Sequence, residues 1–225
     1  MHSFEPSTRL VGLGVALLAV GCGGNGGGTG PCSPGPAVQL VTKDGNGQSW
    51  YFNNPLPAPL RVTALDAGSC PVPGVVVNWA VGPGEGAVSP AQSTTNAAGV
   101  ASTSDSVGSA TIQTVNATST GLPGALATFT THADVAPTSA DVAIADFSFS
   151  PQAVVIQSGG TVTWTWGGAA PHNVTYDGGP TPLPANSTTM MGSGTFPSTI
   201  TTVGKNTYHC SIHPGQMTGS VTVVH

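Results

Sequence analysis

This chain of 225 residues has few charged side chains. They make up 6% of the residues, and Lys and Arg together number only 4. Lys43, Arg61 and Lys205 lie far apart in the sequence, whereas a surface that binds nucleic acid needs clustered Lys and Arg. We therefore expect no nucleic acid among the partners.

Long apolar runs and long stretches of 3.6-residue periodicity are also missing. The apolar stretch from Leu10 to Val20 is shorter than the roughly 20 residues that a helix needs to cross a bilayer. Glycine (32) and proline (20) are abundant instead. This composition is typical of many short strands joined by turns, so we predict an all-β chain of two β-sandwich domains.

The amino-terminal segment is typical of exported proteins. Arg9 precedes the apolar stretch and Gly21-Cys22 follows it, and a small residue before a cysteine indicates processing. We predict a lipoprotein signal peptide over residues 1–21 and a lipid on Cys22, although Ala19 stands where such signals usually carry leucine. An ordinary signal peptide and an uncleaved anchor are the alternatives.

With that lipid, the chain would face the periplasm or the exterior of a bacterial membrane and touch the membrane only through its anchor. Residues 22–35 begin with a glycine-rich run from Gly23 to Gly30. Such a run cannot bury apolar surface, so we expect it to be a flexible tether.

Four cysteines allow a simple assignment. If Cys22 carries the lipid, Cys32 and Cys70 are a plausible disulfide within one domain in an oxidising compartment. Two separate thiols, or a crosslink to another protein, are the alternatives. Cys210 is then the unpaired cysteine, as a metal ligand should be.

The sequence YHCSIHPGQM, from Tyr208 to Met217, brings three kinds of metal ligand together. Cys210 offers a thiolate, His213 an imidazole and Met217 a thioether, and His172 is a candidate second imidazole. Two histidines and a cysteine in a near-trigonal plane, with a weak axial methionine, form a blue-copper site. The pattern predicts one copper ion that cycles between Cu(I) and Cu(II).

Residues 141–225 resemble the cupredoxins, in particular the plastocyanin, amicyanin and pseudoazurin group. The resemblance is carried by the motifs IADFSFSP (144–151), GGTVTW (159–164), PHNV (171–174) and GSVTVV (219–224). It implies a Greek-key β-sandwich and the ligands His172, Cys210, His213 and Met217. It also implies that Asn173 braces the cysteine loop, with Ser211 as its partner.

The axial ligand is open in the sequence. Met217 lies four residues after His213, whereas amicyanin-like loops place methionine three residues after this histidine and plastocyanin-like loops five. Gln216 lies three residues after it and is the alternative axial ligand. We favour Met217 because a thioether is the commoner axial donor.

Other histidines and methionines have simpler interpretations. His209 alternates with Tyr208 and Cys210 along a predicted strand, so it should point away from copper. His132 and His225, at domain or chain ends, should be solvated. Met190 and Met191 form a pair that favours packing or a loop near the site over copper storage.

Residues 36–133 resemble bacterial immunoglobulin-like domains of the invasin and intimin type. The motifs are RVTALD (61–66), PGVVVNW (73–79) and TTNAAGVA (94–101), and Val75, Val77, Trp79 and Val81 share one strand face. This resemblance implies a spacer or adhesion-like module, and no cluster of possible ligands accompanies it. Residues 134–140 are polar and contain Pro137, which is typical of a linker.

The histidine count limits the chemistry. Of the six histidines, His2 lies in the predicted signal, and no His-x-His occurs, so a trinuclear oxidase centre cannot be built from this chain. We therefore expect an electron carrier between redox proteins rather than an enzyme, with His213, Pro171, Pro214 and Gly215 as its docking face. Copper storage or delivery, and surface adhesion through the immunoglobulin-like part, are the alternatives.

Overall fold

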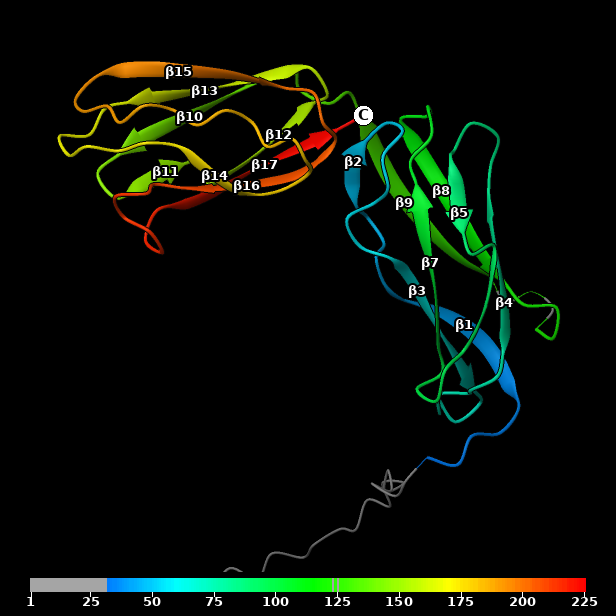
Figure 1. Cartoon of the computed structure of the whole chain (residues 1–225). Coiled ribbons are helices and arrows are strands. Elements are labelled where there is room, and N and C mark those ends of the chain that lie inside the picture. The colour runs from blue at the N-terminus through cyan, green and yellow to red at the C-terminus, as the bar shows by residue number, and fades with distance from the viewer. Residues whose placement is uncertain (1–31, 123, 125) are drawn as a thin grey trace, which may run out of the picture. The chain divides into compact units, whose positions relative to one another are not determined.

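The computed structural model describes residues 32–122, 124 and 126–225 (Figure 1). The predicted signal peptide, Cys22 and most of the glycine-rich tether lie outside this range. The described residues form strands, turns and loops, and they contain no helix. Accordingly, no helix in this part of the chain is long and apolar enough to cross a membrane.

The first half of the described chain is built from two sheets, in which all strand pairs except β2–β9 are antiparallel. One contains, in spatial order, β1 (Ala37–Asp44), β3 (Leu60–Asp66), β7 (Val100–Ser106) and β5 (Ala87–Ser89). The other contains β2 (Ser49–Tyr51), β9 (Leu126–Asp134), β8 (Ile112–Thr118), β4 (Val76–Val81) and β6 (Gln92–Thr94).

The core of this sandwich follows from the alternation of side chains along its strands. In β4, Val77 and Trp79 are buried on one face, and the rings of Trp79 and Phe129 lie 6.0 Å apart. Val75 and Val81, on the same face, pack against the core from its edge. The prediction that Trp79 belongs to the core is confirmed.

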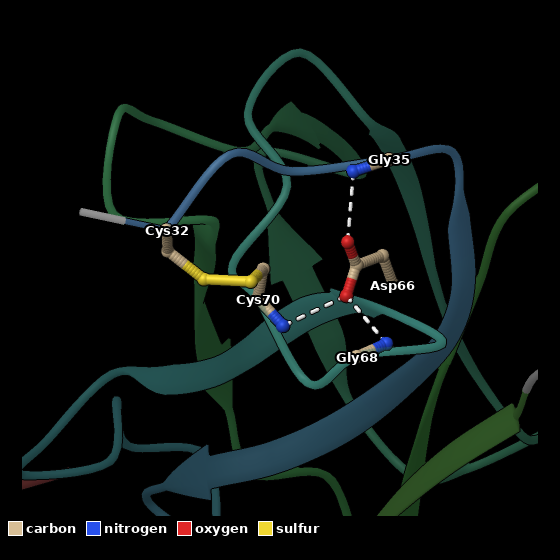
Figure 2. The surroundings of a disulfide bond; sticks show 5 residues. All are labelled: Cys32, Gly35, Asp66, Gly68 and Cys70. Atoms are coloured by element: carbon tan, nitrogen blue, oxygen red, sulfur yellow. Dashed lines mark hydrogen bonds between the residues drawn. A yellow bond between two sulfur atoms is a disulfide. The ribbon is translucent and has the colours of Figure 1, made fainter. Parts of the chain in front are cut away.

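Cys32 and Cys70 form a disulfide in this sandwich, with their Cα atoms 5.8 Å apart (Figure 2). Beside it, the carboxylate of Asp66 accepts hydrogen bonds from the backbone N–H groups of Gly35, Gly68 and Cys70, at 2.7, 2.8 and 2.8 Å. These donors, with Gly35 the largest contributor, lower the pKa of Asp66. The disulfide and the carboxylate together fasten the start of the described chain to the turn after β3.

The second half also forms a sandwich of two sheets (Figure 1). One sheet contains, in order, β11 (Ser148–Ser150), β10 (Ser139–Ala145), β13 (Gly160–Trp166) and β15 (Gly194–Ile200). The other contains β12 (Ala153–Gln157), β17 (Thr218–Val224), β16 (Gly204–His209) and β14 (Thr175–Gly178). The pairs β10–β13 and β12–β17 are parallel, and the other pairs are antiparallel.

Aromatic rings fill the core between these sheets. Trp164 of β13 is fully buried and meets Tyr208 of β16 edge-on, with ring centroids 5.4 Å apart. Phe149 of β11 packs against Tyr208 in the same way, at 5.0 Å. Because β16 alternates, the burial of Tyr208 also turns Cys210 inward, at the end of this core.

The two sandwiches have separate cores, which share no residue. Between the last strand of one (β9) and the first strand of the other (β10) lie residues 135–138. The prediction of an all-β chain with two β-sandwiches is confirmed.

Candidate metal centre

Cys210 lies at the end of β16, directly after His209, and its side chain has no exposed surface. Its backbone N–H donates to the carbonyl of Met217 at 3.0 Å, which closes the loop between β16 and β17 at its base. This loop lies at the end of the sandwich opposite to the C-terminus (Figure 1). Local pairing therefore holds Cys210 and Met217 side by side.

The same loop presents His213. The N–H of His213 donates to the carbonyl of Cys210 at 3.0 Å, and the N–H groups of Gln216 and Met217 both donate to the carbonyl of His213 at 3.2 Å. Gly215 has a φ of 81°, a conformation that glycine adopts at little cost. The tight turn that results points His213 back toward Cys210.

His172 comes from the connection between β13 and β14 and is fully buried. Its backbone N–H donates to the carbonyl of Met190, and its carbonyl accepts from the N–H of Met190, both at 2.9 Å. The same carbonyl accepts a hydrogen bond from Nε1 of Trp166 at 3.0 Å. Three hydrogen bonds thus fix the backbone that carries this imidazole.

These three side chains converge. One ligand atom each from His172, Cys210 and His213 lies within 4.8 Å of the others. The Sγ of Cys210 is 3.8 Å from Nδ1 of His172 and 3.7 Å from Nδ1 of His213. Two imidazole nitrogens that face one buried thiol form a donor set of the kind that binds copper in both oxidation states.

Burial separates the two candidate axial residues. Met217 is 1% exposed and belongs to the same core cluster as Cys210, whereas Gln216 is exposed. Met217 therefore offers its thioether from inside the protein, in the core cluster that also contains Cys210. Gln216 faces the solvent side of the loop.

Asn173 ties the two ligand-bearing segments together. Its Oδ1 accepts from the backbone N–H of Ser211 at 2.9 Å, and its Nδ2 donates to Oγ of Ser211 at 2.8 Å. The residues next to His172 and Cys210 are thus bonded to each other. Such contacts orient ligands and tune a bound metal.

Two residues that the sequence did not single out, Asp146 and Phe147, lie beside the histidines. The Oδ1 atom of Asp146 is 3.5 Å from Nε2 of His172, and the ring of Phe147 lies 4.9 Å from that of His213. Hydrogen bonding from the backbone N–H of Ala170, with a smaller contribution from His172, lowers the pKa of Asp146. No ligand spacing in the sequence marks either residue, because they come from a turn that reaches the site only in the fold.

The other histidines of the described residues do not belong to this donor cluster. Nδ1 of His209 pairs with the carboxylate of Asp177 at 2.7 Å, on the outer side of β16. His132 and His225 are exposed, as is Met191. Met190 packs against the core and bonds to the backbone of His172.

A β-sandwich that carries a buried cysteine and two histidines at one end defines a cupredoxin domain. The pattern described as copper binding proteins of the plastocyanin/azurin family matches residues 136–224. Plastocyanin from Scenedesmus fuscus is 31% identical over 83 residues, which cover 33% of this chain and 85% of that protein. The chain therefore belongs to the plastocyanin/azurin family of copper-binding proteins, and its cofactor is a single copper ion.

Solved structures of cupredoxins are also similar in sequence. A novel purple cupredoxin from Nitrosopumilus maritimus is 30% identical, over 37% of this chain and 98% of that chain, with a TM-score of 0.34. An amicyanin mutant in its Cu(I) form is 33% identical, over 40% of this chain and 86% of that chain, with a TM-score of 0.35. At the level of the family, the chain is a type 1 copper protein of the electron-transfer class.

Proposed function

We propose that His172, Cys210 and His213 bind copper, with Met217 as the axial ligand, and that the protein carries single electrons between redox proteins. The observation that carries this proposal is the convergence of three donor atoms within 4.8 Å at the end of a packed core. Bound copper supplies a one-electron couple between Cu(I) and Cu(II).

The protein's own residues are suited to a carrier rather than to an enzyme. Cys210, His172 and Met217 are buried, and hydrogen bonds hold the loops on which they lie. Catalytic metal sites keep an open position for substrate, whereas here four side chains would fill the coordination sphere. A site held in this way changes little between oxidation states, which favours fast electron exchange.

His213 is the proposed exit for the electron. It is the one partly exposed member of the donor cluster of the described residues. Four exposed residues lie within two positions of a proposed ligand in the sequence: Pro171, Ile212, Pro214 and Gly215. We propose that a redox partner docks on this small apolar surface, close to the His213 ring.

We also propose that the protein is exported and tethered to a membrane through a lipid on Cys22. The predicted signal peptide at 1–21 supports this location, and so does the Cys32–Cys70 disulfide, because disulfides persist in oxidising compartments. In this proposal residues 36–133 form a spacer domain and residues 141–225 the copper domain. The linker between them is shorter than the predicted 134–140, because Asp134 ends β9 and Ser139 begins β10.

The decisive experiment combines optical, EPR and voltammetric measurements on the copper-loaded protein. We expect an intense thiolate-to-copper band in the visible range, a type 1 EPR signal and a reversible Cu(II)/Cu(I) wave. Cys210→Ser should abolish the band, whereas Cys32→Ala with Cys70→Ala should keep it. A colourless Cu(II) complex without a reversible wave would refute the proposal.

A further inference from the structure

The turn between β10 and β11 contains an unusual residue. Phe147 has a φ of 63°, a conformation that bulky side chains rarely adopt, and its side chain is about half exposed. Glycine or asparagine would be the ordinary choice in such a turn. An unfavourable backbone conformation that persists next to a binding site points to a role for the side chain.

The surroundings of Phe147 suggest that role. Its ring meets the ring of His213 edge-on, with centroids 4.9 Å apart and an interplanar angle of 77°. It meets the ring of His172 in the same way, at 6.2 Å and 81°. The rings of the two histidines are themselves 5.0 Å apart. Phe147 therefore contacts both imidazoles at once.

Asp146, the other residue of this turn, approaches His172 from the side of the ring that faces away from Cys210. Its Oδ1 lies 3.5 Å from Nε2, the ring nitrogen remote from Cys210, while Nδ1 faces the thiol. The backbone N–H of Ala170 donates to the same oxygen at 2.9 Å, which holds the carboxylate in place. Gly168 leaves room for this arrangement, because a Cβ there would overlap Asp146.

We propose that the Asp146–Phe147 turn is a clamp that positions the two histidine rings for copper before the metal arrives. Asp146 fixes the tautomer and tilt of His172 through Nε2, and Phe147 restricts rotation of the His213 ring. The clamp rests on the proposed function, in which these two histidines are ligands. Asp146 and Phe147 are positioning residues and do not touch the metal.

The clamp matters most for His213, because this imidazole is partly exposed and lies on a surface loop. A ring that rotates freely must be ordered each time copper binds, and it can turn away when copper is reduced. Residues that pack against a ligand, or bond to its far nitrogen, limit that freedom. The negative charge of Asp146 near His172 should also favour Cu(II) over Cu(I).

The first test uses the metal-free protein, so that its result does not depend on copper. Ring nitrogen and carbon relaxation of the histidines is measured by NMR in the wild type, Phe147→Gly, Phe147→Tyr, Asp146→Ala and Asp146→Asn. We expect Phe147→Gly to mobilise the His213 ring while the fold is retained, because glycine suits the turn. Phe147→Tyr, which keeps an aromatic ring at this position, should leave the His213 ring ordered. Asp146→Ala should mobilise the His172 ring.

The second test uses the copper-loaded protein. We expect Phe147→Gly and Asp146→Ala to release copper to a chelator about tenfold faster, the lower end of losses seen when such supporting contacts are removed. Asp146→Asn, which removes charge and keeps an acceptor oxygen, should raise the reduction potential. Asp141→Asn, which removes an exposed carboxylate from β10, the strand that precedes this turn, is the matched control and should leave the reduction potential unchanged.

The two proposals fail in different ways. Ordered histidine rings in both Phe147→Gly and Asp146→Ala, with unchanged copper release, would overturn the clamp even if the wild type is a blue-copper protein. A wild type without a thiolate-to-copper band would overturn the proposed function, and the metal-free NMR series would still decide whether the turn holds the rings.

Discussion

Asn173 and Ser211 are joined by two hydrogen bonds, one to the backbone N–H of Ser211 at 2.9 Å and one to its hydroxyl at 2.8 Å. Asn173 is largely buried, so Asn173→Ala would leave the Ser211 N–H without its acceptor. We expect a loss of about 1–3 kcal/mol in the free energy of unfolding, together with a changed EPR spectrum. Urea unfolding and EPR of the copper-loaded variant measure both.

Ser211→Ala is the matched control for that prediction. It removes the hydroxyl and keeps the bond from the backbone N–H to Asn173, so its effect should be clearly smaller. Equal effects of the two substitutions would contradict the bracing role of the backbone contact.

The axial position can be tested with a pair of neighbours. Met217→Leu keeps an apolar side chain of similar volume and removes the thioether, so the protein should stay folded, at a cost below about 1.5 kcal/mol. We expect its reduction potential and optical spectrum to shift. Gln216→Ala, on the exposed side of the loop, should leave both unchanged. The opposite pattern, measured by voltammetry and absorption, would assign Gln216 as the ligand.

The N-terminal sandwich contains a buried carboxylate that should make its stability depend on pH. Asp105 is 1% exposed, and both of its carboxylate oxygens lack a hydrogen-bond partner among the described residues. Burial, with a smaller contribution from Glu85, raises the pKa of Asp105 to about 6. Since the folded state holds this proton more tightly than the unfolded state, stability should fall as pH rises from about 4 through 6 and then level off.

Asp105→Asn should remove this dependence. A pKa raised by about 2 units corresponds to roughly 3 kcal/mol, and we expect most of this amount as added stability of the variant at pH 8. Unfolding by urea between pH 4.5 and 8 provides the measurement. Asp44→Asn, on the exposed end of β1, should keep the wild-type slope. A wild type that grows more stable from pH 4.5 to 6.5 would contradict the prediction.

Removal of the disulfide should destabilise one sandwich only. Cys32 and Cys70 are 38 residues apart, and the chain-entropy relation gives about 4 kcal/mol for a loop of this length. Cys32→Ala with Cys70→Ala should lower the unfolding free energy of the N-terminal sandwich by about this amount. The copper spectrum should not change, because Cys210 lies in the other core. A bleached spectrum in this variant would show that the two parts are coupled.

Strand alternation was the part of the fold that the sequence predicted best. The period of two places Trp79 in one core, and it turns Tyr208 and Cys210 inward while His209 pairs with Asp177 outside. Spacing along the chain could not choose between Met217 and Gln216, because burial depends on how the loop closes at Gly215. The sequence did not indicate Asp146 and Phe147 as site residues for a related reason, because their neighbours at the site are distant in sequence.

Each sandwich has a bridge between segments 38 residues apart: the Cys32–Cys70 disulfide in one, and the facing pair His172 and Cys210 in the other. With copper bound as proposed, the second bridge becomes a metal crosslink that stabilises the folded state by mass action. The stability of the two sandwiches would then depend on different reagents. A thiol reductant would loosen the first bridge, and a copper chelator the second, so the protein would register disulfide-reducing conditions and copper shortage in separate places.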